Sequence, residues 1–193
     1  MTFAVRPATL NDAGRIAAIY APIVETTHIS FEEVAPTEAE MRARIESAQS
    51  RMPWLVADAG DVIAYSYASE HRVRAAYRWS VDVALYVTAH ARRSGAGRAL
   101  YTALFAILKR QGFYNAFAGI ALPNDASIGF HRTLGFEPVG VYRNVGYKLG
   151  RWCDVSWWQR PLAAPHRHPP EPLPLTGRPA SAGTVHGCRH PYR

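Results

Sequence analysis

The sequence predicts an α/β domain of the α+β type, in which a mixed, mostly antiparallel sheet of seven strands is flanked by about four helices. Of the 193 residues, 48% are hydrophobic, which is enough for one core of ordinary size. Seven short segments have the alternating or β-branched character of strands, and four longer ones have apolar residues at helical spacing. Composition changes sharply near residue 160, so we divide the chain into a domain at 1–160 and a tail at 161–193.

The N-terminal half shows recognisable start and stop signals. Asn11 or Asp12 can cap a first helix, whose apolar residues recur at helical spacing. Thr37 begins the capping-box pattern Thr-Glu-Ala-Glu, which predicts a second helix as far as about Ser47. A tight turn at Ala59–Gly60 joins two of the expected strands. The strands expected in this half are 2–6, 54–58 and 61–69.

The second half contains the clearest strand. Residues 80–87 alternate strictly, so that one face is apolar and the other carries Ser80, Asp82, Ala84 and Tyr86. A Gly-rich turn, a helix at 98–111 ended by Gly112, and a strand at 115–122 follow, which predicts a right-handed parallel crossover. The last elements are a helix between Asn124 and Gly135 and two strands, EPVGVYRNVGY and KLGRWCDVSWWQR.

Charge and composition exclude several functional classes. The net charge is +7, of which the tail accounts for +3 and the domain for +4, a balance that suits an anionic ligand. Because no nucleic-acid-binding motif is present, we expect no nucleic acid partner. Apolar runs are too short for a membrane span and the N-terminus lacks a secretory signal, so we expect a cytoplasmic protein without a membrane partner. Two cysteines make neither a disulfide framework nor a metal motif.

The tail has a composition of its own. It holds eight of the fourteen prolines and four of the eight histidines, with no apolar periodicity. Proline fixes φ and lacks an amide donor, so we expect a disordered or extended segment. Metal binding by the histidines and capture of a proline-binding module by PPEPLP remain alternatives.

The Gly-rich turn between strand and helix has the chemistry of an anion site. The first turn of a helix leaves backbone N–H groups without intrahelical partners, and the helix dipole adds positive charge there. Glycines allow an anion to approach the backbone, and arginines add charge. The turn therefore predicts a bound phosphate or pyrophosphate, although the same pattern also fits an ordinary strand-to-helix connection. Its residues are Arg92, Arg93, Ser94, Gly95, Ala96, Gly97 and Arg98.

Together with its surroundings, this turn resembles the GCN5-related N-acetyltransferase (GNAT) family. The turn Arg-x-x-Gly-x-Gly follows an alternating strand, and a helix, a buried strand, Asn-x-x-Ser and FHRTLGF come after it. The segments PWLVAD, YRWSVDVALYV, ALPNDASIGFHRTLGF and VGYKLGRWCDVSWWQ resemble the phosphinothricin N-acetyltransferase branch in order and spacing, over roughly residues 3–160. The resemblance implies acetyl-CoA as cosubstrate, no metal, a small amino-acid acceptor and a homodimer that uses the last strands.

The resemblance also implies residue roles. The cofactor-binding set would be Leu85, Tyr86, Val87, Arg93, Ser94, Gly95, Ala96, Gly97, Arg98 and Asn124, with the strand backbone facing the pantetheine arm and the turn facing the pyrophosphate. Phe31 and Tyr77 would lie against the amino acid, and Arg74 and Lys148 would face its anionic groups. Arg72, Arg78 and Arg143 are expected to edge the same cationic cleft, with a solvated basic face as the alternative.

Two residues are candidates for proton transfer. An amine attacks a thioester only after losing a proton, and a free α-amine has a pKa near 8, so a base is needed near neutral pH. Asp82 is the one carboxylate on the strand at 80–87, although this branch usually has Glu there, and a salt bridge to Arg74 or Arg78 is the structural alternative. His131 stands where many relatives have a tyrosine near the departing sulfur, so it is a second catalytic candidate. Other acceptors, namely methionine sulfone or sulfoximine and protein or peptide N-termini, remain open, as does a non-catalytic acetyl-CoA-binding role.

Overall fold

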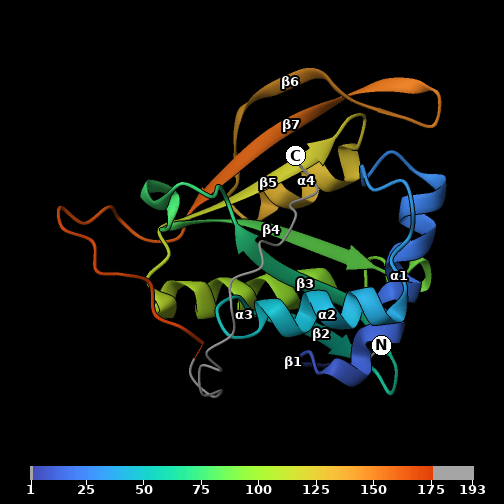
Figure 1. Ribbon diagram of the computed structural model, residues 1–193, viewed down its shortest axis with the longest axis horizontal. Coiled ribbons are helices and arrows are strands. Elements are labelled where there is room, and N and C mark those ends of the chain that lie inside the picture. The colour runs from blue at the N-terminus through green and yellow to red at the C-terminus, as the bar shows by residue number, and fades with distance from the viewer. Residues whose placement is uncertain (1, 176–193) are drawn as a thin grey trace.

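A seven-stranded sheet with the order β1-β2-β3-β4-β5-β7-β6 organises the computed structural model, which describes residues 2–175 (Figure 1). All neighbouring strands are antiparallel except β4 and β5, which are parallel. This confirms the predicted fold class. The strands are β1 (Ala4–Pro7), β2 (Trp54–Asp58), β3 (Val62–Glu70), β4 (Ser80–Val87), β5 (Asn115–Ala121), β6 (Glu137–Lys148) and β7 (Arg151–Pro161).

Helices α1 (Ala13–Thr26) and α2 (Glu38–Ala48) cover one face of the sheet. The predicted capping box forms at α2, where the Thr37 N–H donates to Glu40 Oε2 at 2.8 Å and the Glu40 N–H donates to Thr37 Oγ1 at 3.2 Å. A short 3-10 turn at Leu10–Asp12 precedes α1, and Asp12 there holds the guanidinium of Arg6 at 2.8 Å. The apolar sides of both helices pack on β2 and β3 through Ile16, Ile19, Met41, Ile45, Trp54, Val56 and Tyr65.

Helix α3 (Ala96–Gln111) covers the opposite face, with α4 (Asp125–Thr133) beside it. It begins two residues earlier than the apolar pattern predicts, because Gly95 has φ +90° and turns the chain into the helix there. Gly112, also at φ +90°, ends the helix as predicted. Three leucines of α3 and the apolar face of β4 form the centre of the larger core: Val81, Val83, Leu100, Leu104 and Leu108.

The β6–β7 hairpin forms the far edge of the sheet and arches beyond the helices (Figure 1). A two-residue turn joins the strands, with Leu149 at φ +47° and Gly150 at φ +79°. Five of the eleven residues of β7 are buried, whereas nearly all of β6 is exposed. The hairpin therefore leaves an apolar surface open to solvent, to which Val139, Val141, Tyr142, Val145, Tyr147, Leu149 and Trp152 contribute.

The chain beyond β7 is extended as far as the structure describes it. Leu162 is still buried and its N–H donates to the Tyr114 carbonyl at 2.8 Å. Residues 163–175 form no helix or strand, but they return to the domain, where the Leu173 N–H donates to the Gln111 carbonyl at 2.7 Å. The composition predicts a segment that does not pack on the domain, but main-chain hydrogen bonds of Leu162 and Leu173 attach it there. The predictions for 176–193 lie outside the described residues. None of the helices within residues 2–175 combines the length and apolar character needed to cross a bilayer.

Candidate active site

The parallel strands β4 and β5 separate after a short contact. Within the described chain, their ladder has three residue pairs, from Ser80–Asn115 to Asp82–Phe117, although β4 continues to Val87 and β5 to Ala121. A cavity of about 80 Å³ lies where they part. Backbone groups that leave a ladder are available to a ligand. Residues of β4, β5 and α4 that line the cavity include Leu85, Tyr86, Gly119, Asn124 and His131.

The glycine-rich turn leads into the N-terminus of α3, the helix that follows β4. Arg93 adopts φ +64° and Gly95 φ +90°, so the chain turns sharply before the helix. The Ala96 N–H donates to Ser94 Oγ at 3.3 Å, and the Arg98 guanidinium donates to Thr133 Oγ1 on α4 at 3.0 Å. Beyond these contacts, the first-turn N–H groups and the dipole of a sixteen-residue helix favour an anion here.

Gly97 has a packing role as well. A Cβ placed on it would lie 3.0 Å from Leu85 Cδ2 and 3.3 Å from Phe130 Cζ. The missing side chain therefore lets α3 approach both β4 and α4. Close helix packing is a second reason for glycine at this position, in addition to the predicted approach of an anion to the backbone.

Helix α4 places two predicted residues at the cavity. Asn124 caps the helix, with its Oδ1 accepting from the Ser127 N–H at 3.1 Å. His131 is buried, its Nδ1 lies 2.8 Å from the Ser127 carbonyl oxygen, and its Nε2 lies 3.4 Å from the Tyr101 hydroxyl. Burial lowers the pKa of His131. Its imidazole is therefore favoured in the neutral form, with a carbonyl to accept the Nδ1 proton.

Asp82 forms a pair with a histidine that the sequence analysis did not single out. Its Oδ1 lies 2.7 Å from Nδ1 of His71, and the two side chains are only 17% and 12% exposed. The structural alternative named Arg74 or Arg78 as its partner, but Arg78 forms an ion pair with Glu171. His71 follows β3, whose Ser69 pairs with Asp82 across the ladder. The register between β3 and β4 is the feature that would have indicated this histidine, because it places the end of β3 beside Asp82.

The predicted acceptor-side residues have unequal surroundings. Phe31 is half-buried and packs over Gly146, where a Cβ would come within 2.3 Å of its ring. Tyr77 and Arg74 are exposed on the loop between β3 and β4. Lys148 is buried, and its Nζ donates to the carbonyls of Val24 at 2.5 Å and Ser30 at 2.7 Å. Two of its three N–H donors thus hold the last turn of α1 and the chain that follows it, which differs from the expected position facing the substrate.

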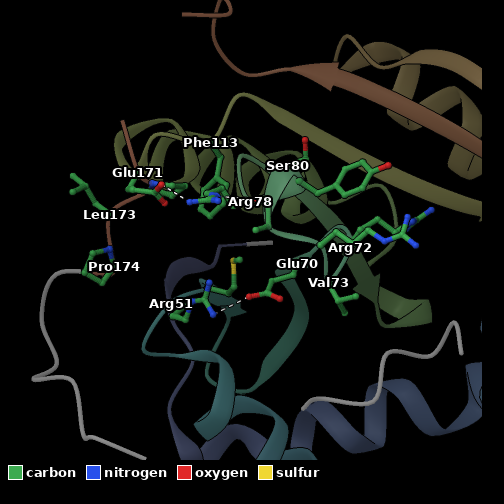
Figure 2. A pocket seen from close by; sticks show the side chains of 15 residues that line it. Arg51, Glu70, Arg72, Val73, Arg78, Ser80, Phe113, Glu171, Leu173 and Pro174 are labelled. Carbon is green, nitrogen blue, oxygen red and sulfur yellow. Dashed lines mark hydrogen bonds and ion pairs between the residues drawn. The ribbon is translucent and has the colours of Figure 1, made fainter. Parts of the chain in front are cut away.

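A larger cavity of about 560 Å³ lies beside the same loop. Figure 2 shows the ion pairs at its rim, Arg51 with Glu70 at 2.9 Å and Arg78 with Glu171 of the extended C-terminal segment. Arg72, Arg74 and Tyr77 also line it. The five basic residues expected to share one cleft do not gather: Arg143 pairs with Asp154 at 3.0 Å and Lys148 is buried, so only the three arginines of the loop meet here.

Comparison with known proteins shows that this chain is an acetyl-CoA-dependent N-acetyltransferase. The family described as "Acetyltransferase (GNAT) domain" matches residues 5–157. The phosphinothricin N-acetyltransferase of Streptomyces viridochromogenes is 39% identical over 174 residues, which cover 89% of this chain and 94% of that protein. The L-methionine sulfoximine/L-methionine sulfone acetyltransferase of Pseudomonas paraeruginosa is 35% identical, with 82% and 94% covered.

A solved structure agrees with this assignment. The phosphinothricin acetyltransferase of Sinorhizobium meliloti, determined in complex with acetyl-CoA, superposes with a TM-score of 0.81 at 37% identity, covering 88% of this chain and 96% of that one. The chain therefore belongs to the GNAT family, in its phosphinothricin N-acetyltransferase-like branch.

Proposed function

We propose that the protein transfers the acetyl group of acetyl-CoA to the α-amine of a small amino acid or analogue such as phosphinothricin. The transfer would occur by direct attack with general-base assistance. The observation that carries the proposal is the separation of β4 and β5, with the Asp82–His71 pair at the last paired residue and the N-terminus of α3 after the end of β4. A thioester held along β4 would then lie between an anion site and a carboxylate.

Acetyl-CoA would bind along β4 and the turn after it. The backbone of Leu85, Tyr86 and Val87 would face the pantetheine arm and the thioester carbonyl, because β5 no longer pairs with these residues. The pyrophosphate would lie on the turn from Arg93 through Arg98, where first-turn N–H groups and the helix dipole meet. Asn124 uses its Oδ1 for capping, which leaves its amide N–H groups for the cofactor.

Proton transfer is assigned to Asp82 and His131. Asp82 lies on the sheet face opposite the α3 core and ends the ladder with β5, so its carboxylate borders the point where the amine must attack. His131 lines the small cavity from α4 and would serve the departing thiolate. The two roles can be tested separately, because Asp82 lies on β4 and His131 lies on α4.

The acceptor would occupy the space beside the β3–β4 loop. Arg74 is the exposed cation there and would meet an anionic group, and Tyr77 would contact the apolar part of the amino acid. Phe31 would contribute a wall from the chain after α1. Lys148 would act chiefly by holding that chain in place, with its third N–H facing the acceptor.

A panel of amines tests the acceptor. Free thiol released from acetyl-CoA would be measured with phosphinothricin, methionine sulfoximine, methionine sulfone and an alanyl peptide at equal concentration. The proposal predicts the highest kcat/KM for phosphinothricin, because its second anionic group can meet Arg74. Higher activity with the sulfone or sulfoximine would select the second function, which the relative from Pseudomonas paraeruginosa favours. Thiol release with none of these amines would contradict an amino-acid acetyltransferase.

A homodimer and a cytoplasmic location complete the proposal. The exposed apolar side chains of the β6–β7 hairpin support self-association, and Trp152, which is 62% exposed and packs edge-on against Tyr147, lies among them. Trp152→Glu should shift the mass measured by light scattering from dimer toward monomer, whereas Val34→Glu, at an even more exposed apolar residue elsewhere, should not. Equal masses for both variants would contradict this interface. Cell fractionation tests the location, since a membrane or secreted fraction would contradict it.

A further inference from the structure

We propose that His71 is the residue that takes the proton from the acceptor amine, and that Asp82 orients it. The inference rests on the proposed function, because it names the base of that same reaction. In this assignment Asp82 is a positioning residue, and the ring nitrogen Nε2 of His71 is the group that touches the substrate.

The hydrogen bond between the two side chains sets this arrangement. His71 Nδ1 and Asp82 Oδ1 are 2.7 Å apart in a largely enclosed setting. A carboxylate only accepts hydrogen bonds, so it fixes the tautomer with the proton on Nδ1 and leaves a lone pair on Nε2. Within residues 2–175, Nε2 makes no hydrogen bond. The carboxylate also stabilises the imidazolium that forms when Nε2 accepts a proton.

Aromatic contacts hold the ring in place. The imidazole stacks on Phe117 of β5 with centroids 4.2 Å apart, and the rings of Tyr77 and Trp157 approach it edge-on at 5.9 and 6.0 Å. The Arg72 guanidinium donates to the His71 carbonyl at 2.7 Å and fixes the backbone. A side chain clamped on several sides keeps one rotamer, which is the preorganisation that proton transfer needs.

The pair stands at the reacting position of the proposed site. Asp82 and Phe117 form the last pair of the β4–β5 ladder, and the strands open immediately beyond them. Tyr77, which contacts His71, also lines the arginine-bordered cavity assigned to the acceptor. His71 therefore connects the acceptor space with the strand that would hold the thioester. His131, by contrast, already has neighbours at both ring nitrogens.

The proposed step balances in atoms and charge. The acceptor ammonium gives its first proton to His71 Nε2, which passes it to water. The amine lone pair then forms the C–N bond at the thioester carbonyl carbon, and the C–S bond breaks as coenzyme A leaves as the thiolate. The second proton on nitrogen ends on that thiolate. The products are the amide, the free thiol and one released proton, with no oxidant or further reactant.

His71→Asn is the decisive variant, because the asparagine amide can keep a donor toward Asp82 while Nε2 is lost. We expect kcat with the acceptor to fall by roughly 10²–10⁴-fold and the KM for acetyl-CoA to stay within about twofold. The double variant with Asp82→Asn should be little worse than His71→Asn alone, since the two residues act as one unit. His90→Ala, at an exposed histidine in the 3-10 turn Ala89–Ala91, is the matched control and should keep wild-type rates.

Chemical rescue separates a base from a structural residue. His71→Ala leaves space beside Phe117, so added imidazole should restore thiol release in a saturable way, and it should not accelerate the His90→Ala control. Two results would overturn the inference: a His71→Asn variant that keeps more than a third of the wild-type kcat, or a folded His71→Ala variant that imidazole does not rescue. In either case, turnover by the wild-type protein would still support the proposed function. A wild-type protein inactive with every amine would contradict the proposed function and this inference together.

Discussion

Removal of the extended C-terminal segment should destabilise the domain, and two truncations isolate the effect. A chain ending at residue 175 keeps every contact that the structure describes, whereas a chain ending at residue 169 loses three hydrogen bonds and an ion pair. The lost hydrogen bonds join Leu173 to the Gln111 backbone at 2.7 Å, the Gln111 side chain to Leu173 at 3.0 Å and Trp79 Nε1 to the Pro170 carbonyl at 2.7 Å. The lost ion pair is the exposed one between Arg78 and Glu171.

The magnitude follows from these contacts. Each hydrogen bond contributes roughly 0.5–1.5 kcal/mol to the free energy of unfolding, and an exposed ion pair contributes about 0–1 kcal/mol. The entropy of ordering the segment opposes them, but prolines at 169, 170, 172 and 174 keep that cost low. We expect a net loss of about 1–2 kcal/mol for the shorter chain, which is about 2–8 °C in Tm for a protein of this size.

Calorimetry and kinetics on the two truncations check this estimate. The shorter chain should melt lower, and its KM for the acceptor should rise because the β3–β4 loop loses the anchors at Arg78 and Trp79. The KM for acetyl-CoA should not change, because the segment contacts Gln111 at the C-terminal end of α3, whereas the proposed pyrophosphate site lies at the N-terminal end of that helix. Equal melting temperatures for the two truncations would show that these contacts do not stabilise the domain and that the segment is the inert tail that its composition predicts.

Three further predictions concern the acceptor, the core and acid stability. Arg74→Ala should raise the KM for a dianionic acceptor roughly ten- to a hundredfold and spare that for acetyl-CoA, because a charge-assisted hydrogen bond is lost; a rise in both would show that Arg74 supports the fold. Gly97→Ala should cost about 1–3 kcal/mol by overpacking against Leu85, as measured by denaturant unfolding, whereas Gly129→Ala, with open space around it, should cost nothing; equal stabilities would contradict the packing role. The hydrogen bond from Arg6 lowers the pKa of Asp12 to about 2. The ionised Asp12 carboxylate therefore stabilises the fold above about pH 4, and this stabilisation is lost as the pH falls toward 2 and the carboxylate is protonated. Asp12→Asn should therefore cost about 1.5 kcal/mol near pH 7 and nothing below pH 2, and a cost independent of pH would contradict the linkage.

Local signals in the sequence were enough to predict most of the fold. The capping box at Thr37 forms as predicted, and the strict alternation at 80–87 becomes a strand that spans those same residues. The Gly95 conformation moved the start of α3, because a left-handed turn depends on φ rather than on apolar spacing. A helix cap and the alternation of a strand are local features, so the sequence records them directly even though the strand itself is held by pairing with distant residues.

The parts of the site that were missed depend on contacts between distant residues. His71 meets Asp82 only because β3 and β4 pair in one particular register across a nine-residue loop, 71–79. Lys148 is buried because the hairpin turn brings it onto carbonyls more than a hundred residues earlier in the chain. Neither register nor long-range docking leaves a periodic pattern in the sequence. The family resemblance therefore implied a substrate contact for Lys148, and nothing in the sequence indicated a role for His71.

The rate of thiol release from acetyl-CoA with phosphinothricin, measured against pH for wild type and Asp82→Asn, tests whether Asp82 and its partner supply the base for acetyl transfer. If they do, kcat/KM for the acceptor falls by roughly 10²–10⁴-fold near neutral pH in the variant, because the pair no longer accepts the amine's proton. The deficit should shrink as pH rises through the amine pKa near 8, since more of the acceptor then arrives deprotonated. Absence of thiol release from the wild-type protein would contradict acetyl transfer to this amine, and an Asp82→Asn variant with more than a third of the wild-type rate at every pH would contradict the role of Asp82.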